Sequence, residues 1–367
     1  MRPRETRVLR HRQIYGIKST YCVLGEVKGG GMSEIRSVLV TGGAGYVGSA
    51  LTPRLLDEGY AVTVYDVMYF DSVHLPTEHP KLTVVQGDIR DTDSIRAACE
   101  GQDAVIHLAC ISNDPSFELD EDLSKSINFD CFEPMVVAAK EAGVRRFIYA
   151  STSSVYGVSD APEVTEDHPL VPITLYNKYK GLCEPLLFKH QSDDFTCVTI
   201  RPSTVCGYAP RLRLDLTVNI LTNHAINRRK ITVFGGEQKR PNLHIDDMCD
   251  LYSLLLTIDK QKIAGETFNA GYRNLRVSEI ATIVRGAVLD ECPELGDIEI
   301  VTTPTDDIRS YHVNSDKIAQ KLGFRPRRTV EDAVRDLVRA FKAGEIPDSF
   351  DDDRYYNVKT LKAKEAA

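Results

Sequence analysis

The sequence predicts an α/β fold built on a doubly wound parallel sheet, and two observations indicate it. Short β-branched runs alternate with helical patterns at a regular interval from Ser37 to Ala150, and a glycine-rich turn follows the first run directly. Such alternation is typical of parallel sheets, whose ligands bind outside the carboxyl ends of the strands. We therefore expect the functional residues at that edge of the sheet.

Composition narrows the class of protein. The 367 residues are 42% hydrophobic and 27% charged, which fits one large or two medium globular domains. The net charge of −8 argues against a nucleic-acid partner, because proteins that neutralise phosphates along a duplex carry a basic face. The nine cysteines include no Cys-x-x-Cys pair, so neither a disulfide framework nor a metal site is predicted, and a reduced, cytoplasmic protein is expected. No apolar run reaches the ~18 residues of a membrane span.

Residues 1–36 are expected to be an extension outside the fold. Met32 follows three glycines and precedes the first strand-like run, so it is a candidate for the native start. The first dozen residues are rich in arginine, which also fits an organelle transit peptide.

The first predicted elements are a strand, a tight turn and a helix. Ser37–Thr41 has the pattern of a buried strand, and Gly42-x-x-Gly45-x-x-Gly48 follows it. Gly42 permits the turn, Gly45 lets backbone N–H groups approach a diphosphate, and Gly48 lets the helix pack closely. This arrangement predicts a dinucleotide site.

A second strand, Ala61–Tyr65, ends at Asp66. An acid at this distance from the glycines is placed to accept hydrogen bonds from the ribose hydroxyls of an adenosine. Because the same carboxylate would repel a 2′-phosphate, the pattern predicts NAD in preference to NADP.

Further strands are predicted at Leu82–Val85, Ala104–Ala109, Arg146–Ala150 and Val198–Pro202, with a helix over 127–142. Asp88, just beyond the third strand, is placed to reach the adenine amine. The fifth strand leads into a run of hydroxyl residues that includes Thr152. Hydroxyls at the carboxyl end of a strand lie where the chemistry of such folds occurs.

Tyr176 and Lys180 are four residues apart in a predicted helix, so their side chains share a face. A neighbouring ammonium favours the phenolate, which lowers the tyrosine pKa and makes the phenol a general base. Alone, this spacing is also common on solvated helix surfaces.

In combination, Gly42-x-x-Gly45-x-x-Gly48, Asp66, Thr152, Tyr176 and Lys180 resemble the extended short-chain dehydrogenase/reductase superfamily, in particular its nucleotide-sugar epimerases and dehydratases. The resemblance covers most of the chain, from about Val38 to Phe324. It implies NAD as cofactor, a nucleotide-diphosphate sugar as substrate, and a homodimer.

The resemblance also implies the domain plan. A Rossmann-type NAD-binding domain is expected over 37–202 and a smaller, mainly substrate-binding α/β lobe over 203–345. A segment near 242–258 is expected to return to the first domain, and 346–367 to form a tail. The helices at 127–142 and 176–190 pair between subunits in many relatives.

The roles that the resemblance implies fall into three groups. The expected catalytic residues are Thr152, Tyr176 and Lys180. The expected cofactor-binding residues are Gly42, Gly45, Tyr46, Val47, Gly48, Asp66, Asp88, Ile89, Leu108, Ala109, Tyr176, Lys180 and Pro202. The expected substrate-binding residues are Thr152, Tyr176, Arg213, Asn219, Arg240 and Arg309, of which Arg240 and Arg309 are assigned to the diphosphate because a guanidinium binds phosphate oxygens in pairs.

The residues after Thr152 bear on the net reaction. In the dehydratases an Asp-Glu pair follows the catalytic threonine, whereas this chain has Ser153 and Ser154, whose hydroxyls at normal pKa cannot serve as acid and base. The sequence therefore favours an epimerase, acting at C4 through a 4-keto intermediate. The alternative is a 4-dehydrogenase or 4-ketoreductase with net redox, because the segment 210–219 resembles bacterial relatives of that kind. A non-catalytic nucleotide-binding module is the remote alternative.

Overall fold

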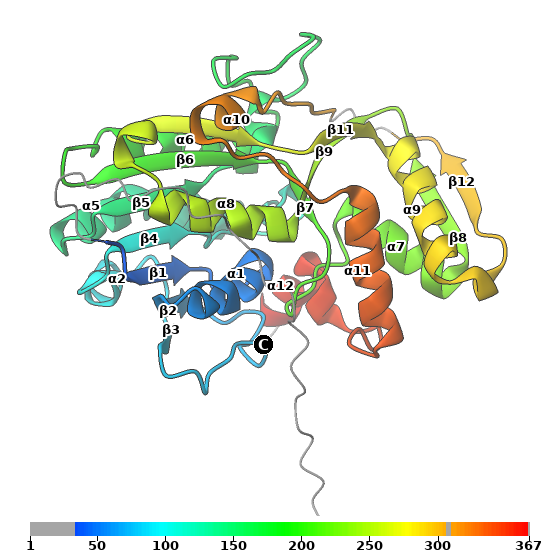
Figure 1. The fold of residues 1–367 in the computed structure, drawn as a ribbon, viewed down its shortest axis with the longest axis horizontal. Coiled ribbons are helices and arrows are strands. Elements are labelled where there is room, and N and C mark those ends of the chain that lie inside the picture. The colour runs from blue at the N-terminus through cyan, green and yellow to red at the C-terminus, as the bar shows by residue number, and fades with distance from the viewer. Residues whose placement is uncertain (1–33, 306–309, 366–367) are drawn as a thin grey trace, which may run out of the picture. The chain divides into compact units, whose positions relative to one another are not determined.

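In the computed structural model, residues 34–305 and 310–365 are described, and Ile35–Ala367 forms one compact unit. Its centre is a seven-stranded parallel sheet of order β10-β6-β5-β4-β1-β2-β3 (Figure 1). The strands are β1 (Ser37–Thr41), β2 (Ala61–Asp66), β3 (Leu82–Gln86), β4 (Ala104–His107), β5 (Arg146–Ala150), β6 (Thr196–Pro202) and β10 (Glu266–Ala270). The doubly wound parallel sheet is confirmed.

Helices cover both faces of this sheet (Figure 1). Alternate residues of β1 point to opposite faces, so Val38 and Val40 join one apolar cluster and Leu39 joins the other. The first cluster includes side chains of α1 (Tyr46–Asp57) and α8 (Ile245–Thr257). The second includes side chains of α2 (Thr92–Cys99), α5 (Phe132–Glu141) and α6 (Leu175–Phe188).

The register of the parallel strands aligns their carboxyl ends. Thr41, the last residue of β1, pairs with Tyr65 of β2 and with His107 of β4. Ala150, the last residue of β5, pairs with Ile200 of β6. The loops that carry the predicted site residues therefore begin along one edge of the sheet.

The helix expected over 127–142 differs from the observed segment. A π-helical turn, Ser126–Asp130, follows the short helix α4 (Glu121–Lys125), and α5 begins only at Phe132. Within the π turn, the Asn128 amide bonds both the backbone N and the backbone O of Ile111, at 2.8 and 2.9 Å. These two bonds fix the loop after β4, which apolar periodicity does not reveal.

The rest of the chain builds a second apolar core. The parallel pair β8 (Lys230–Phe234) and β12 (Glu299–Thr303) packs with α7 (Thr217–Arg228), α9 (Val277–Glu291) and α11 (Val330–Lys342). Helix α8 packs on α1 and joins the apolar cluster of the large sheet. The later strand β10 returns there too, which the sequence did not predict. The borders at 202 and 345 stay a prediction.

A three-stranded sheet stands where the chain passes between these two regions. It is formed by β7 (Thr204–Cys206), β9 (Lys239–His244) and β11 (Arg273–Arg276). Each strand is next in the chain to an element of the large sheet, because β7 follows β6, β9 precedes α8, and β11 follows β10.

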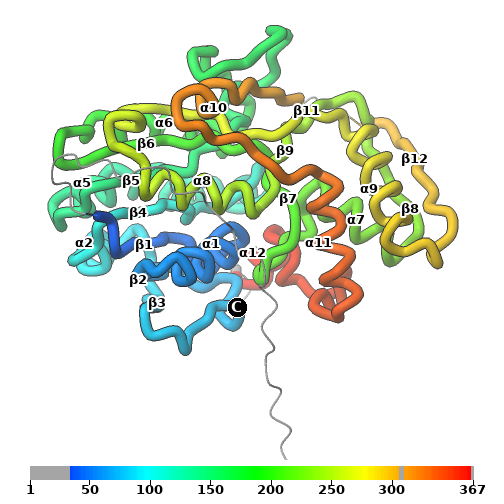
Figure 2. Tube along the Cα trace, in the orientation of Figure 1, coloured from blue at the N-terminus to red at the C-terminus, as the bar shows by residue number. Residues whose placement is uncertain are grey.

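The remaining helices are shorter, and Figure 2 follows the chain through them to its end. They are α3 (Asp114–Phe117), α10 (Asp316–Leu322) and α12 (Asn357–Glu365). Tyr355 and Tyr356, just before α12, pack on a cluster that includes Tyr46 of α1 and Leu337 of α11. In the described part of the chain, no helix combines the length and apolarity needed to cross a membrane.

A buried ion pair joins β6 to α6 beneath the carboxyl edge. Arg201 donates to both carboxylate oxygens of Glu184, at 2.9 and 2.5 Å. Glu184 also accepts a hydrogen bond from the Ser151 hydroxyl, and Arg201 donates to the Tyr156 hydroxyl, at 2.6 Å each. The pair therefore anchors the segment that contains Thr152.

Replacing one member of this pair should destabilise the fold strongly. In Arg201→Met, Glu184 would stay buried without its cation, so we expect a loss of about 3–5 kcal/mol in the free energy of unfolding, measured by urea denaturation. The control, Arg96→Met, removes a surface ion pair and should cost less than about 1 kcal/mol. Equal losses in the two variants would contradict this assignment.

Candidate active site

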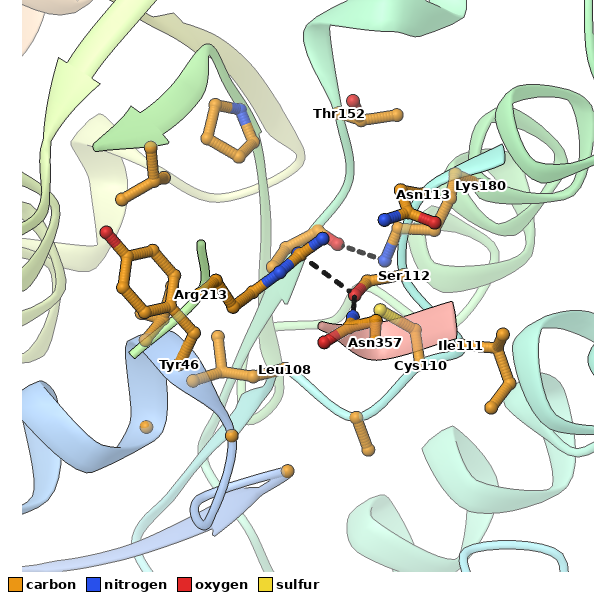
Figure 3. A pocket seen from close by; sticks show the side chains of 18 of the residues that line it. Tyr46, Leu108, Cys110, Ile111, Ser112, Asn113, Thr152, Lys180, Arg213 and Asn357 are labelled. Atoms are coloured by element: carbon orange, nitrogen blue, oxygen red, sulfur yellow. Dashed lines mark hydrogen bonds between the residues drawn. The ribbon is translucent and has the colours of Figure 1, made fainter. Parts of the chain in front are cut away.

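One cavity of about 560 Å³ opens at the carboxyl edge of the large sheet and collects most of the predicted site residues (Figure 3). Those that line it are Gly42, Gly45, Tyr46, Val47, Gly48, Asp66, Asp88, Ile89, Leu108, Ala109, Thr152, Tyr176, Lys180, Pro202, Arg213 and Arg240. The segments that meet here lie as far apart in the chain as Gly42 and Leu361, so the cavity is a product of the fold.

The glycine turn has the geometry that a bound diphosphate requires. Gly42 has a φ of +73°, and a Cβ there would lie 2.5 Å from the backbone N of Ala109. A Cβ on Gly48 would lie 2.5 Å from Gly43, so α1 packs closely on the turn. Gly45 caps α1 without a side-chain hydrogen bond, and the first turn of α1 contains no acidic residue. The helix N-terminus therefore keeps N–H groups for an anion.

Asp66 lies at the end of β2, where its carboxylate faces the glycine turn. It accepts hydrogen bonds from the backbone N of Ala44 at 3.0 Å and of Met68 at 2.8 Å. Burial raises the pKa of Asp66, while these bonds and the charge of Arg211 lower it. Each oxygen can accept a further bond, so the carboxylate fits a ribose diol.

Asp88, predicted at the adenine, also lines the cavity. The Arg90 side chain binds its carboxylate from Nε and Nη2, at 3.0 and 2.6 Å, and these bonds lower the pKa of Asp88. Asp88 is thus held in its charged form, at the end of the cavity that lies beside β2 and β3.

Thr152 is positioned by a chain of hydroxyl and amide groups. Its Oγ1 lies 2.8 Å from the hydroxyl of Ser154 and accepts the Ser154 backbone N–H at 3.2 Å. The Ser154 hydroxyl in turn bonds the side-chain oxygen of Asn177, on α6. The helix that carries Tyr176 therefore also orients the threonine.

Tyr176 is buried in the cavity, and its pKa is set by burial and by nearby charges. Burial raises the pKa of Tyr176 well above its ordinary value, Cys110 and Asp114 act in the same direction, and Arg213 lowers it. Arg213 is thus a cation that opposes the effect of burial on Tyr176, and the effect of Lys180 on this pKa stays a prediction. The Lys180 ammonium donates to the backbone O of Ala150, at the end of β5.

Arg213 is held in the cavity by two partners. Its Nε and Nη2 donate to the Asp215 carboxylate at 2.9 and 3.1 Å. Its Nη1 donates to the Ser112 hydroxyl at 3.2 Å, and the Asn357 amide donates to the same oxygen at 2.9 Å, as Figure 3 shows. Because Asp215 takes the Nε and Nη2 side of the guanidinium, a ligand could meet Arg213 only from its other side, and its substrate role stays a prediction.

Asn219 does not reach the cavity, contrary to the prediction. It is fully buried on α7, where its amide accepts the Gly207 backbone N–H at 3.0 Å and donates to the Arg213 backbone O at 2.8 Å. Its place is to hold the segment that carries Arg213. Arg240, on β9, lines the cavity, and its guanidinium lies 5.6 Å from the Tyr311 ring. Arg309 lies outside the described residues.

Several lining residues were not nominated from the sequence, among them Ser112, Asn113, Arg211 and Asn357. Asn113 has a φ of +76°, and backbone strain of this kind gathers at ligand sites. Arg211 repeats the Arg-x-Arg spacing with Arg213, which was a usable signal. Asn357 offered none, because it lies in the segment expected to be a tail.

The fold and the site together define a dinucleotide-dependent enzyme of the Rossmann type with a tyrosine and a lysine at its reactive end. Residues 38–271 match the model of the "NAD dependent epimerase/dehydratase family". The chain belongs to this family, within the extended short-chain dehydrogenase/reductase enzymes, and its cofactor is NAD. The glycine turn and Asp66 fit that cofactor.

Relatives of two activities are similar to the chain. It is 29% identical to a UDP-glucose 4-epimerase of Lactobacillus helveticus, over 81% of this chain and 94% of the relative. It is 28% identical to a dTDP-glucose 4,6-dehydratase of an Actinoplanes species, over 83% of this chain and 98% of the relative. The crystal structure of DesIV, a dTDP-glucose 4,6-dehydratase from Streptomyces venezuelae with NAD and TYD bound, superposes with a TM-score of 0.73 at 25% identity and covers 84% of this chain and 97% of DesIV.

Asp66→Ala should relax the preference for NAD. Without the carboxylate the ribose loses its acceptor and a 2′-phosphate is no longer repelled, so the NAD/NADP affinity ratio should fall at least tenfold in fluorescence titrations with NADH and NADPH. Asp93→Ala removes an exposed carboxylate and is the control. An unchanged affinity ratio in Asp66→Ala would contradict the assignment of this residue to the cofactor site.

Proposed function

We propose that the protein is an NAD-dependent nucleotide-sugar epimerase that acts at C4. The observation that carries the proposal is the pair of serines after Thr152. Ser153 is buried, and the hydroxyl of Ser154 is bonded to Thr152 and Asn177. Loss of water across C5–C6 needs an acid and a base beside the catalytic hydroxyl, and neither serine supplies one. Epimerisation needs only proton transfer at the sugar hydroxyl and room for the keto sugar to turn.

The proposed roles follow from the contacts of each residue. Tyr176 takes the proton of the C4 hydroxyl, and Thr152 donates a hydrogen bond to the same oxygen as the carbonyl develops. Lys180, with one N–H on Ala150, keeps two for the nicotinamide ribose. Bound NAD supplies the hydride acceptor that oxidation of the sugar carbon requires.

Arg240 is the proposed ligand of the sugar diphosphate. It lines the same cavity as Tyr176 and Thr152 but comes from β9, a different element from α6 and from the loop after β5. A guanidinium at this wall would bind the diphosphate and leave the sugar ring beside the tyrosine. Arg309 stays a second candidate for this contact from the sequence. The homodimer and the cytoplasmic location also stay predictions.

A second candidate function is a 4-dehydrogenase or 4-ketoreductase, favoured by the sequence of the segment 210–219. The two functions differ in cofactor balance. An epimerase regenerates NAD within each turnover and shows no net absorbance change at 340 nm, whereas net redox consumes cofactor or a keto-acid co-substrate.

A panel of UDP-, GDP-, CDP- and dTDP-sugars in deuterated water tests the assignment. A C4 epimerase should give an isomer of unchanged mass without solvent deuterium, because the hydrogen at C4 returns from the cofactor. A dehydratase would give a product lighter by one water that contains solvent deuterium. Product of the latter kind would overturn the proposal.

Tyr176→Phe should lower kcat at least about a hundredfold on the sugar that is turned over, because the proton acceptor is lost. Tyr179→Phe is the matched control: it lies on the same helix, against Phe117 and Phe129, and does not line the cavity. Full activity in Tyr176→Phe would refute the assignment of the base.

Arg213→Met should shift the pH dependence of kcat/KM. The phenolate is the active form, so the rate rises with pH until Tyr176 has ionised. Removing the guanidinium raises the pKa of Tyr176, which moves the rising limb to higher pH, while Arg213→Lys keeps a cation and should move it less. A limb that stays in place in Arg213→Met would contradict the role of this charge.

A further inference from the structure

Arg211 is a buried cation in the part of the cavity that Asp66 lines. Its side chain is 5% exposed and lines the cavity. The guanidinium carbon lies 3.6 Å from the centre of the Phe70 ring, and Nη2 donates to the Asn357 side-chain oxygen at 2.6 Å. Stacking and hydrogen bonding thus fix the orientation of the guanidinium.

This cation forms no close ion pair in the described part of the chain, although the charges of Asp215 and Asp66 act on it from a greater distance. Arg201 and Arg213 each bond a carboxylate through two nitrogens. Arg211 forms no such pair with any described residue, and its Nε has no hydrogen-bond partner. Burial and the neighbouring charge of Arg213 lower the pKa of Arg211 to about 9, while Asp215 and Asp66 raise it, so the cost of burying this charge is only partly offset. A bound anion would remove that cost.

The position of Arg211 indicates which anion. Its backbone N donates to the hydroxyl of Ser49 at 3.1 Å, and Ser49 is in the first turn of α1. The backbone of Arg211 therefore stands beside the helix N-terminus whose free N–H groups suit a diphosphate, and its guanidinium lines the same cavity. We propose that Arg211 is a ligand of the NAD diphosphate and that α12, through Asn357, is part of the cofactor site.

Asn357 connects Arg211 to both sides of the cavity. Its amide nitrogen donates to Ser112, in the loop after β4, and its backbone N donates to Asp215 at 3.2 Å. Asn357 is 3% exposed, and α12 continues into the cavity wall with Leu361. The first residue of α12 therefore sets where the guanidinium of Arg211 can point. The proposal depends on the NAD cofactor of the family and not on the sugar reaction.

The test is binding of ADP, which carries the diphosphate and adenosine of NAD, and of UDP, which carries the diphosphate expected in a substrate. Calorimetric titration of the full chain, freed of bound nucleotide, gives both affinities. Arg211→Met should weaken the binding of ADP at least about tenfold, because a charge-assisted hydrogen bond is lost. It should change the affinity for UDP less than about twofold. Asn357→Ala should weaken ADP by about three- to tenfold.

Arg354→Met, an exposed arginine just before α12, is the matched control and should leave both affinities unchanged. Unaltered ADP binding in Arg211→Met, or a loss confined to UDP, would overturn the proposal. Thermal melting checks that each variant folds, and Asn357→Ala decides the matter if Arg211→Met does not fold. Because ADP carries no sugar, the outcome is independent of whether the enzyme is an epimerase.

Discussion

The parallel pairing of β1 with β2 and β4 is the constraint on which the site depends. It brings the ends of three strands to one level, so the glycine turn, Asp66 and the loop after β4 must share a small space. The approach is so close that Gly42 can carry no side chain against Ala109. The same pairing, extended through β5 and β6, delivers Thr152 to this edge. Each loop supplies one or two groups, and the sheet supplies their alignment.

Electrostatics sets the second constraint. A tyrosine in a low-dielectric cavity resists ionisation, yet the role proposed for Tyr176 requires it to ionise. Arg213 opposes burial of the phenol, and Asp215 keeps that arginine in place while reducing its net charge. An arginine without Asp215 would act more strongly on the phenol, but burying its unpaired charge would cost more free energy. Lys180 lies at the end of β5, where the backbone O of Ala150 accepts one of its three N–H groups and the proposed nicotinamide ribose could accept the others.

Local patterns made much of this predictable. The strands, the glycine turn, Asp66 and the Tyr-Lys spacing are properties of short segments, and the structure brings their residues into one cavity. Contacts between distant segments were not predictable. Asn219 carries a polar side chain that looked available, but it and Thr222 lie on the buried face of α7 and bond backbone groups there, so polarity misled. Asn357 meets Arg211 across 146 positions, and no sequence periodicity encodes such a meeting. The π turn at Asn128 was missed for the same reason.

The three-stranded sheet β7-β9-β11 has a consequence for the two-lobed description. Three passages of the chain between the large sheet and the second core run through this small sheet, and hydrogen bonds tie its strands together there. The chain also leaves the second core for α10, which packs on β10, and returns to that core at α11. The two regions are therefore joined by several segments, and a change in the angle between them would bend the three strands together, close to Pro202 and Arg240. A fragment cut at residue 202 would lose β10 and leave the β6 edge unpaired, which invites aggregation.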